Sequence, residues 1–286
     1  MINKIGLGVS FFDIRFGGVY RGRQVLCIGR NGSGKSLLSY HFANQGLADG
    51  DKVLLLSGSL AKDVVILGES YGMPLANAVR TEQLMLLEYA GLFGVEESLS
   101  SNIMLPPEVF VELQEIIESH SISRVVLDSV LPWVAIQPVT RLTEHIYSFI
   151  HALDRLGVTT LMTLPKPLSN AAFALKKQME DIVPVVLTMD HQEGSNRTLR
   201  VSKYLGEAYG ISQPISIRIA PGKGLVLEAE QSQEQDLKDK EGVASHAAEV
   251  RSSFSFIPPK EGAGPLSATP KKEIKGPIRF SDIIRS

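Results

Sequence analysis

The sequence predicts an α/β fold in which helices flank a mostly parallel central sheet. Short apolar runs at residues 24–28, 51–58, 83–89, 124–128 and 157–164 alternate with segments of helical periodicity. The run that begins at the Asp-Gly turn before residue 51 is apolar almost throughout, which indicates a parallel strand covered on both faces. A glycine-rich turn joins the first run to the helix that follows it, and this order is typical of α/β proteins that bind ligands at the strand ends.

Composition narrows the class of protein. The chain has 286 residues, of which 44% are hydrophobic and 21% charged, as in ordinary globular proteins. A net charge of −2 gives no overall basic field to attract nucleic acid. The single cysteine, Cys27, lies in a predicted buried strand, so neither a disulfide framework nor a cysteine metal site is expected. Without a signal-like start or a run of membrane-spanning length, we expect a cytoplasmic protein with no membrane insertion.

The turn after the first strand carries the strongest chemical signal. Residues 29–36 read Gly-Arg-Asn-Gly-Ser-Gly-Lys-Ser and fit G-x-x-x-x-G-K-[ST], the phosphate-binding loop, or P-loop, of nucleoside triphosphatases. Backbone N–H groups of such a loop converge on phosphate, Lys35 adds a cation and the Ser36 hydroxyl can hold Mg²⁺. The helix predicted over residues 37–47 points its positive end at the same place. We therefore expect ATP and Mg²⁺ as ligands, and the residues expected to bind the nucleotide are Gly29, Asn31, Gly32, Ser33, Gly34, Lys35 and Ser36.

The other segments continue the alternation of helices and strands. Residues 8–22 indicate a short helix and a glycine turn, and residues 60–80 a helix interrupted at residues 72–74. A proline pair opens a helix that runs to residue 117, and residues 141–156 form a helix with one apolar face. The remaining expected segments are a loop at 91–106, a C-terminal β-hairpin of strands 182–189 and 198–203 around a turn at 193–196, and closing strands at 214–219 and 224–227.

A second motif ends the strand at residues 124–128. An apolar strand that finishes in an aspartate is the Walker B pattern, and Asp128 would hold the Mg²⁺ water shell opposite Ser36. The alternative is that Asp128 simply caps the next helix. Its place after a P-loop, two further strands and a helix favours the metal site.

The entry segment carries a family resemblance. Glycines and an aspartate in the pattern G-[IV]-x-x-x-D-x-x-x-G-G-x-x-x-G precede the P-loop, and the segment resembles the KaiC-like branch of RecA-type ATPases. The matching residues are Gly8, Asp13, Gly17, Gly18 and Gly22. The resemblance continues over about residues 5–228, and it implies a RecA-like fold and a homo-oligomer, such as a hexamer, with nucleotide at the subunit interfaces.

The resemblance also implies roles for later residues. Thr163 stands where the family has a polar residue that senses the γ-phosphate, although an ordinary β-branched strand residue is the slightly preferred explanation. Lys203 matches the first cation of a Lys-x-Arg pair that reaches a neighbouring subunit's nucleotide, while Leu205 replaces the arginine. Lys35, Asp128, Thr163 and Lys203 are thus the expected catalytic residues. Residues 165–180 lie where RecA-type proteins have pore-facing loops, but a solvated helix face is the simpler explanation of their lysines, which are Lys166, Lys176 and Lys177.

One departure from the family bears on hydrolysis. RecA-type ATPases carry a glutamate just after the second strand, and Ser59 and Leu60 stand at that position here. Asp63, the nearest carboxylate, should lie a turn into the next helix. Since a positioned general base contributes roughly 10²–10⁴ in rate, we expect slow turnover at best. Whether the chain is an enzyme is therefore left open, with a weak ATP hydrolase favoured.

The chain changes character after about residue 228. Residues 229–286 are rich in Gln, Glu, Lys, Ser and Pro and are expected to be disordered, whereas residues 1–228 form the ATP-binding domain. Two apolar islands, at residues 254–257 and 278–284, are either scattered apolar residues or short docking peptides for a protein partner.

Three functions remain open from the sequence. The first is an ATP-gated oligomeric switch or slow ATPase that recruits a partner. The second is a RecA- or DnaB-like ATPase on DNA, which the neutral charge and the missing glutamate disfavour. The third is a scaffold in which ATP is a structural ligand.

Overall fold

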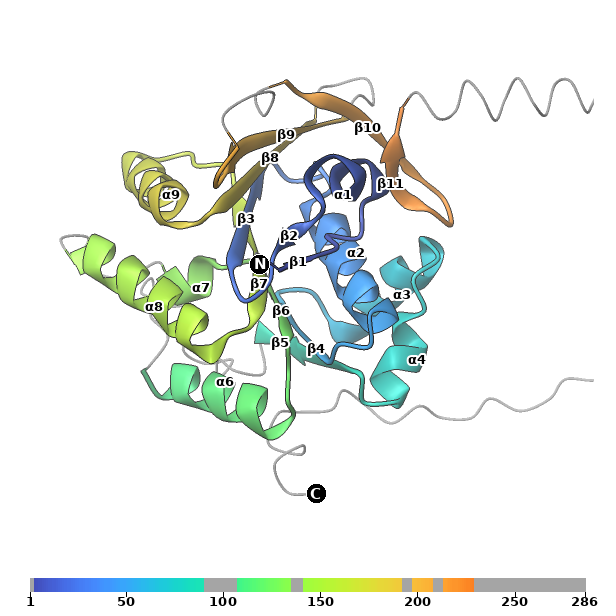
Figure 1. Ribbon diagram of the computed structural model, residues 1–286, viewed down its shortest axis with the longest axis horizontal. Helices are drawn as coiled ribbons and strands as arrows, with labels where there is room; N and C mark the ends of the chain where they lie inside the picture. The colour runs from blue at the N-terminus through green and yellow to red at the C-terminus, as the bar shows by residue number, and fades with distance from the viewer. Residues whose placement is uncertain (1–2, 90–106, 135–140, 192–196, 208–212, 229–286) are drawn as a thin grey trace, which may run out of the picture. The chain divides into compact units, whose positions relative to one another are not determined.

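The computed structural model describes residues 3–89, 107–134, 141–191, 197–207 and 213–228. Within them the chain alternates between strands and helices, as predicted (Figure 1). The strands are β1 Lys4–Ile5, β2 Val19–Tyr20, β3 Gln24–Gly29, β4 Val53–Ser57, β5 Leu84–Glu88, β6 Arg124–Asp128, β7 Thr159–Pro165, β8 Val185–His191, β9 Arg197–Tyr204, β10 Ile215–Ala220 and β11 Gly224–Leu227. The helices are α1 Ser10–Phe16, α2 Lys35–Ala48, α3 Ala61–Ser70, α4 Leu75–Arg80, α6 Pro107–Ser119, α7 Leu131–Val134, α8 Leu142–Leu156 and α9 Asn170–Ile182.

One large sheet organises the described residues. Its strand order is β11-β10-β9-β8-β3-β7-β6-β4-β5, and neighbours from β8 to β5 run parallel. The three strands β9, β10 and β11 extend the sheet by antiparallel pairing. The predicted mostly parallel sheet and the C-terminal hairpin are both confirmed, and the turn expected at residues 193–196 lies outside the described residues.

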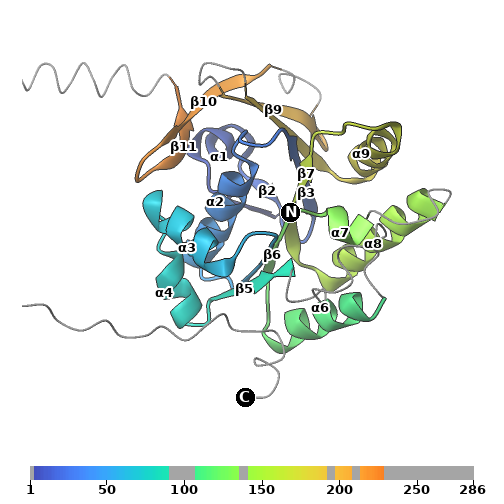
Figure 2. The same cartoon turned by 180° about the vertical axis from the view of Figure 1, so that it is seen from behind.

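Helices cover both faces of this sheet. Helices α1 to α4 lie on one face, and α6 to α9 lie on the other (Figures 1 and 2). Strands β3 and β4 are buried at every residue, which explains why their sequences are apolar without alternation.

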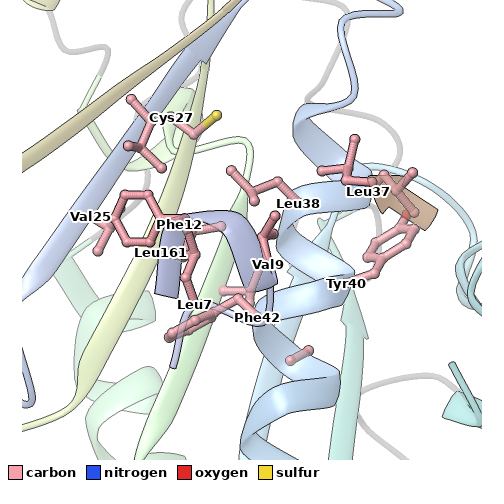
Figure 3. Packing of buried hydrophobic residues seen from close by; sticks show 14 of the residues in the cluster. Leu7, Val9, Phe12, Val25, Cys27, Leu37, Leu38, Tyr40, Phe42 and Leu161 are labelled. Carbon is pink, nitrogen blue, oxygen red and sulfur yellow. The ribbon is translucent and has the colours of Figure 1, made fainter. Parts of the chain in front are cut away.

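The core on the α2 face joins elements from both ends of the domain. Figure 3 shows Leu38 of α2 and Phe12 of α1 against Val25, Cys27 and Leu161 of the sheet, and all five belong to one buried cluster. Burial of such side chains supplies the main stabilisation, at roughly 25 cal/mol per Å² of apolar surface. Helix α2 is thereby fixed on the sheet, and its N-terminus is fixed with it.

The glycine and aspartate pattern of the entry segment has a structural cause. The Asp13 carboxylate accepts hydrogen bonds from the backbone N–H groups of Leu7, Gly8 and Val9, at 2.7, 2.9 and 3.2 Å. Gly8 has φ +88°, and a Cβ there would lie 2.3 Å from the carbonyl oxygen of His41 on α2. The segment therefore packs directly against the helix that follows the P-loop.

A buried arginine, Arg124, connects the start of strand β6 to the loop before β4 and to the entry segment. Arg124 begins β6 with 0% of its surface exposed, and its Nε lies 2.6 Å from Asp51 while Nη2 contacts Asp49. Its Nη1 donates to the carbonyl oxygen of Gly6 at 2.8 Å. Burial raises the pKa of Asp51, but hydrogen bonds from Arg124 and Ser123 outweigh it and hold that pKa below its usual range.

The structure corrects some element boundaries. The strand expected to begin at residue 182 begins at Val185, because α9 continues to Ile182. Within residues 165–180, where a solvated helix face was the favoured expectation, helix α9 begins at Asn170, and the Ser169 side chain accepts a hydrogen bond from Ala172 N–H at 3.3 Å. The short pair β1–β2 and helix α7 were not expected. None of the helices in the described ranges is long and apolar enough to cross a membrane.

Residue contacts divide the chain into Met1–Glu228 and Ala229–Ser286. The first unit holds the sheet and its helices. The second unit, which contains both apolar islands, lies outside the described residues. The loop expected at residues 91–106 of the first unit also lies outside them.

Candidate nucleotide-binding site

The P-loop connects β3 to α2 at the carboxyl edge of the parallel strands. Helix α2 begins at Lys35, and Gly34 precedes it with φ +102°, a backbone conformation that favours glycine. A Cβ at Gly29 would lie 2.3 Å from the Met189 carbonyl oxygen and 2.7 Å from Ser33 Oγ. The loop thus needs glycine at Gly29 and Gly34 to keep this shape. Its spacing in the sequence and its place in the fold agree with a phosphate cradle at a helix N-terminus.

Lys35 is the cation of this loop. Its Nζ donates to the carbonyl oxygen of Arg30 at 2.8 Å. Burial lowers the pKa of Lys35, although the nearby Cys27 and Asp128 act in the opposite direction. Burial raises the pKa of Cys27 to about 12, so its thiol is neutral at ordinary pH.

A row of polar side chains crosses the sheet beside the P-loop. Strand register pairs Cys27 with Thr163, Ser57 with Asp128, and Ser57 with Glu88. Since Leu127 pairs with Met162, the next residues along β6 and β7 are Asp128 and Thr163. Thr163 Oγ1 donates a hydrogen bond of 2.5 Å to Asp128 Oδ1. The structure therefore brings the two predicted residues together on neighbouring strands.

These residues fit a magnesium-bound triphosphate. Ser36 and Asp128 offer a hydroxyl and a carboxylate, the oxygen donors that Mg²⁺ prefers. In the described part of the chain no cluster of three or more His, Cys, Asp or Glu side chains could hold a metal alone. Mg²⁺ is typically bound by one or two carboxylates together with substrate phosphates, which agrees with this sparse donor set. The buried Ser33 Oγ, which has no hydrogen-bond partner in the described structure, adds a polar atom within the loop.

The position of the family's glutamate holds no base. Ser59 N–H donates to Ser57 Oγ at 3.0 Å, and Leu60 is 44% exposed at the start of α3. Asp63 lies in the first turn of α3, as predicted. The sequence prediction overlooked Glu88, whose Oε1 accepts a hydrogen bond from Ala61 N–H at 2.6 Å and so lies beside this position. The sequence signal that could have identified Glu88 is a single carboxylate at the end of an apolar strand.

Lys203 lies away from the P-loop of its own chain. Its Nζ donates to the carbonyl oxygens of Glu180 and Asp181, both at 2.8 Å. These carbonyls belong to the last turn of α9, where a cation interacts favourably with the helix dipole. Leu205 is 53% exposed and carries no charge to replace the family's arginine. A role for Lys203 at a neighbouring subunit's nucleotide stays a prediction.

Charged side chains flank the P-loop on the β8 side. Arg30 and Lys166 both lie 3.6 Å from the carboxylate of Asp190. Burial raises the pKa of Asp190, but the His191 N–H and these two cations outweigh it and hold the pKa below its usual range. Arg197 Nε donates to the carbonyl oxygen of Gly32, in the P-loop, at 3.2 Å. The sequence alone did not identify Arg197, because β9 follows the P-loop by more than 160 residues.

The other two lysines of the expected pore region are on α9. Lys176 forms an ion pair with Glu180 at 2.7 Å, one turn along the helix, and Lys177 is exposed. This arrangement is that of a solvated helix face.

The β10–β11 hairpin packs against α2, the helix that follows the P-loop. Its Leu225 N–H donates to Nε2 of His41, on α2, at 2.9 Å. Burial lowers the pKa of His41 to about 4, with a smaller opposite effect from the backbone of Gly8. Leu225 Cδ2 and Ile219 Cδ1 would lie 3.4 and 3.9 Å from a Cβ at Gly34. The hairpin is thus part of the packing that shapes the end of the P-loop.

Comparison with known proteins agrees with this geometry. Circadian clock oscillator protein KaiC of Prochlorococcus marinus (strain MIT 9313) is 23% identical over 226 residues, which cover 73% of this chain and 43% of that protein. Circadian clock protein KaiC2 of Synechocystis sp. (strain ATCC 27184 / PCC 6803 / Kazusa) is 24% identical over 244 residues, covering 81% and 42%. The chain therefore spans less than half the length of these curated relatives.

The fold has a solved counterpart. The crystal structure of a KaiC-like protein from Pyrococcus horikoshii OT3 superposes with a TM-score of 0.63 and 20% identity, covering 79% of this chain and 99% of that chain. A family model described as "ATPase: KaiC" matches residues 5–231. That match takes in the entry segment, the P-loop, the polar row and the C-terminal hairpin. The chain belongs to the KaiC family of ATPases.

Proposed function

We propose that this protein is an ATP-gated oligomeric switch that binds ATP with Mg²⁺ and hydrolyses it slowly. The observation that carries the proposal is the hydrogen bond between Thr163 and Asp128 beside a complete P-loop, while Ser59 and Leu60 replace the family's glutamate. These observations support a site that would bind a triphosphate but that lacks the family's base for activating water.

The proposed binding of ATP and Mg²⁺ follows from the residues of the P-loop. Its backbone N–H groups and Lys35 would hold the phosphates, and Ser36 and Asp128 would hold Mg²⁺. When bound, Mg²⁺ neutralises charge on the phosphate oxygens. Thr163 fixes the orientation of the Asp128 carboxylate, since its hydroxyl occupies one lone pair of Oδ1.

The proposed slow hydrolysis follows from the residues after β4, Ser59 and Leu60. Neither a serine nor a leucine side chain is a useful base near neutral pH, and the carboxylate of Glu88 is engaged by the N-terminus of α3. Loss of a positioned base reduces the rate by roughly 10²–10⁴. A protein that keeps ATP for long periods is suited to a switch, because the bound state then persists.

Assembly and partner recruitment complete the proposal. In a ring, for example a hexamer, Lys203 would approach the nucleotide of the next subunit, and a cation supplied in this way stabilises charge on the γ-phosphoryl group. Residues 229–286 would recruit a protein partner through the islands at 254–257 and 278–284. Nucleic acid binding and a purely structural role for ATP are the competing hypotheses.

One combined experiment separates these hypotheses. The mass of the purified protein is measured with and without ATP·Mg²⁺, while phosphate release is followed in parallel. We expect ATP to promote assembly and turnover to be far below that of typical enzymes, with binding lost in Lys35→Ala and turnover lost in Asp128→Asn. Fast hydrolysis by a monomer would refute the switch. Salt-dependent binding of single-stranded DNA that stimulates turnover would favour a DNA-associated ATPase, and complete absence of turnover would favour the scaffold.

A further inference from the structure

Glu88 lies on the same face of the sheet as the P-loop helix. Leu84, earlier on β5, belongs to the buried cluster that includes Leu38 of α2. Side chains at even intervals along a strand share a face, so Glu88 faces α2 as well. By the same alternation Asp128 shares the face of Val126, which is in that cluster too. Both carboxylates therefore lie at the carboxyl ends of their strands, on the side of the sheet that α2 covers.

Strand β4 separates the strands that carry these two carboxylates. Its last residue, Ser57, pairs with Glu88 on one side and with Asp128 on the other. Since neighbouring strands lie about 4.8 Å apart, the backbones of Glu88 and Asp128 are about 10 Å apart. The Ser57 side chain between them is small, and its Oγ is turned to the Ser59 N–H at 3.0 Å. A water molecule beside a phosphate fits between two carboxylates at this spacing.

The carboxylate of Glu88 is held beside the residues that replace the family's glutamate. Its Oε1 accepts a hydrogen bond from Ala61 N–H at 2.6 Å, and Ala61 begins α3 directly after Ser59 and Leu60. The other oxygen, Oε2, has no hydrogen bond or ion pair with a residue that the structure describes. One oxygen is thus fixed in position, and the other is free to accept a hydrogen bond from water.

Asp63 is the competing carboxylate near this position. It lies in the first turn of α3 and is exposed, outside the row of side chains at the strand ends. A general base must be held within hydrogen-bond reach of the proton that it takes. Glu88 has a contact that fixes its carboxylate, and within the described part of the chain the carboxylate of Asp63 has none. The geometry therefore favours Glu88.

We propose that Glu88 orients the water that attacks ATP and accepts its proton. This inference rests on the proposed slow hydrolysis and deepens it by naming the residue that sustains it. The water oxygen forms a bond to the γ-phosphorus while the bond from that phosphorus to the bridging oxygen of ADP breaks. One proton of the water passes to Oε2 of Glu88 and is later released to solvent, and the products are ADP and phosphate. Because Oε1 is engaged by Ala61, only one oxygen serves the water, which agrees with slow turnover.

Single-turnover hydrolysis of radiolabelled ATP by the full chain tests the proposal. Glu88→Gln keeps an oxygen for the Ala61 N–H but cannot take up a proton, so its rate should fall about 10²-fold or more. Its affinity for the slowly hydrolysed analogue ATPγS should match that of the unchanged protein. Asp63→Asn is the matched control and should hydrolyse ATP at the unchanged rate. Adding Ser59→Glu to Glu88→Gln should restore part of the rate, because it supplies a carboxylate at the adjacent position.

Several outcomes overturn the inference. An unchanged rate in Glu88→Gln would show that this carboxylate takes no proton, and a loss confined to Glu88→Ala would show that Glu88 only caps α3. Weaker ATPγS binding by Glu88→Gln, in proportion to its rate, would assign it to nucleotide binding instead. A loss of rate in Asp63→Asn alone would move the role to Asp63. If the unchanged protein bound ATPγS but released no phosphate, the proposed hydrolysis would fail together with this inference, whereas failure of the inference alone leaves that turnover intact.

Discussion

Thr163 donates a hydrogen bond of 2.5 Å from Oγ1 to Oδ1 of Asp128, and this bond joins β7 to the last residue of β6. The two residues are 35 positions apart in the chain. Parallel register brings them together, and the bond fixes one oxygen of the carboxylate while the other remains available for a metal-bound water. Thr163 is therefore a positioning residue for Asp128 in this structure.

Replacing Thr163 with valine should weaken Mg²⁺-dependent nucleotide binding. The change keeps the shape of the side chain and removes the hydroxyl, and loss of such a supporting hydrogen bond typically costs about tenfold or more in metal affinity. Mg²⁺ titrations at fixed ATP concentration measure the effect. Thr160→Val is the matched control, because Thr160 lies on the same strand but its buried Oγ1 has no partner in the described structure. Equal effects of both variants would argue against the positioning role.

Arg124 should be essential for stability. Arg124→Met removes the buried guanidinium that contacts Asp49 and Asp51, and breaking a buried ion pair costs about 3–5 kcal/mol. Asp51 keeps its ion pair with Arg21 at 3.4 Å and Asp49 its hydrogen bond from Gln45, so we expect a loss at the lower end of that range, about 3 kcal/mol. Urea denaturation measures the free energy of unfolding. The control is Arg23→Met, since Arg23 is 45% exposed in its 3.1 Å ion pair with Asp154 and such a surface pair contributes at most about 1 kcal/mol. A similar loss in the two variants would contradict the assignment.

His41 should make stability depend on pH. Burial holds the pKa of His41 near 4 in the folded state, against 6.5 for an ordinary histidine. As pH falls below 6.5, the unfolded chain takes up a proton that the folded chain refuses, so stability present above that pH is lost on the way down to about 4. The expected loss is about 2 kcal/mol between about pH 7 and about pH 5.

Urea denaturation at the two pH values checks this expectation. His41→Gln can still accept the Leu225 N–H but does not titrate, so its stability should fall less than that of the unchanged chain. The same pH dependence in both proteins would show that groups other than His41 cause it.

Removal of residues 229–286 should leave the nucleotide site intact. The described contacts that shape the P-loop come from Met1–Glu228, which forms one compact unit. A chain ending at Glu228 is therefore expected to keep its ATP affinity and melting temperature but to lose capture of a partner protein. Nucleotide titration, thermal unfolding and co-purification test the three points. Unchanged partner capture and assembly would refute docking by the tail.

Much of the fold could be predicted from local sequence. Continuous apolar runs indicate strands buried on both faces, and β3, β4, β6 and β7 lie where those runs predicted them. The P-loop could be recognised because its residues are consecutive. The end of α9 was missed, because the apolar residues at 182 and 183 suit a helix end as well as a strand and only packing chooses between them.

The sequence by itself determined that a phosphate loop follows a buried strand and that the usual glutamate is replaced. Those facts depend only on neighbouring residues. The tertiary structure decided which distant residues meet: Thr163 contacts Asp128 through parallel register, Glu88 contacts Ala61 after the neighbouring strand, and Arg197 contacts Gly32 of the P-loop through the antiparallel hairpin. Register and strand order bring residues together that are far apart in the chain, and no local pattern encodes them.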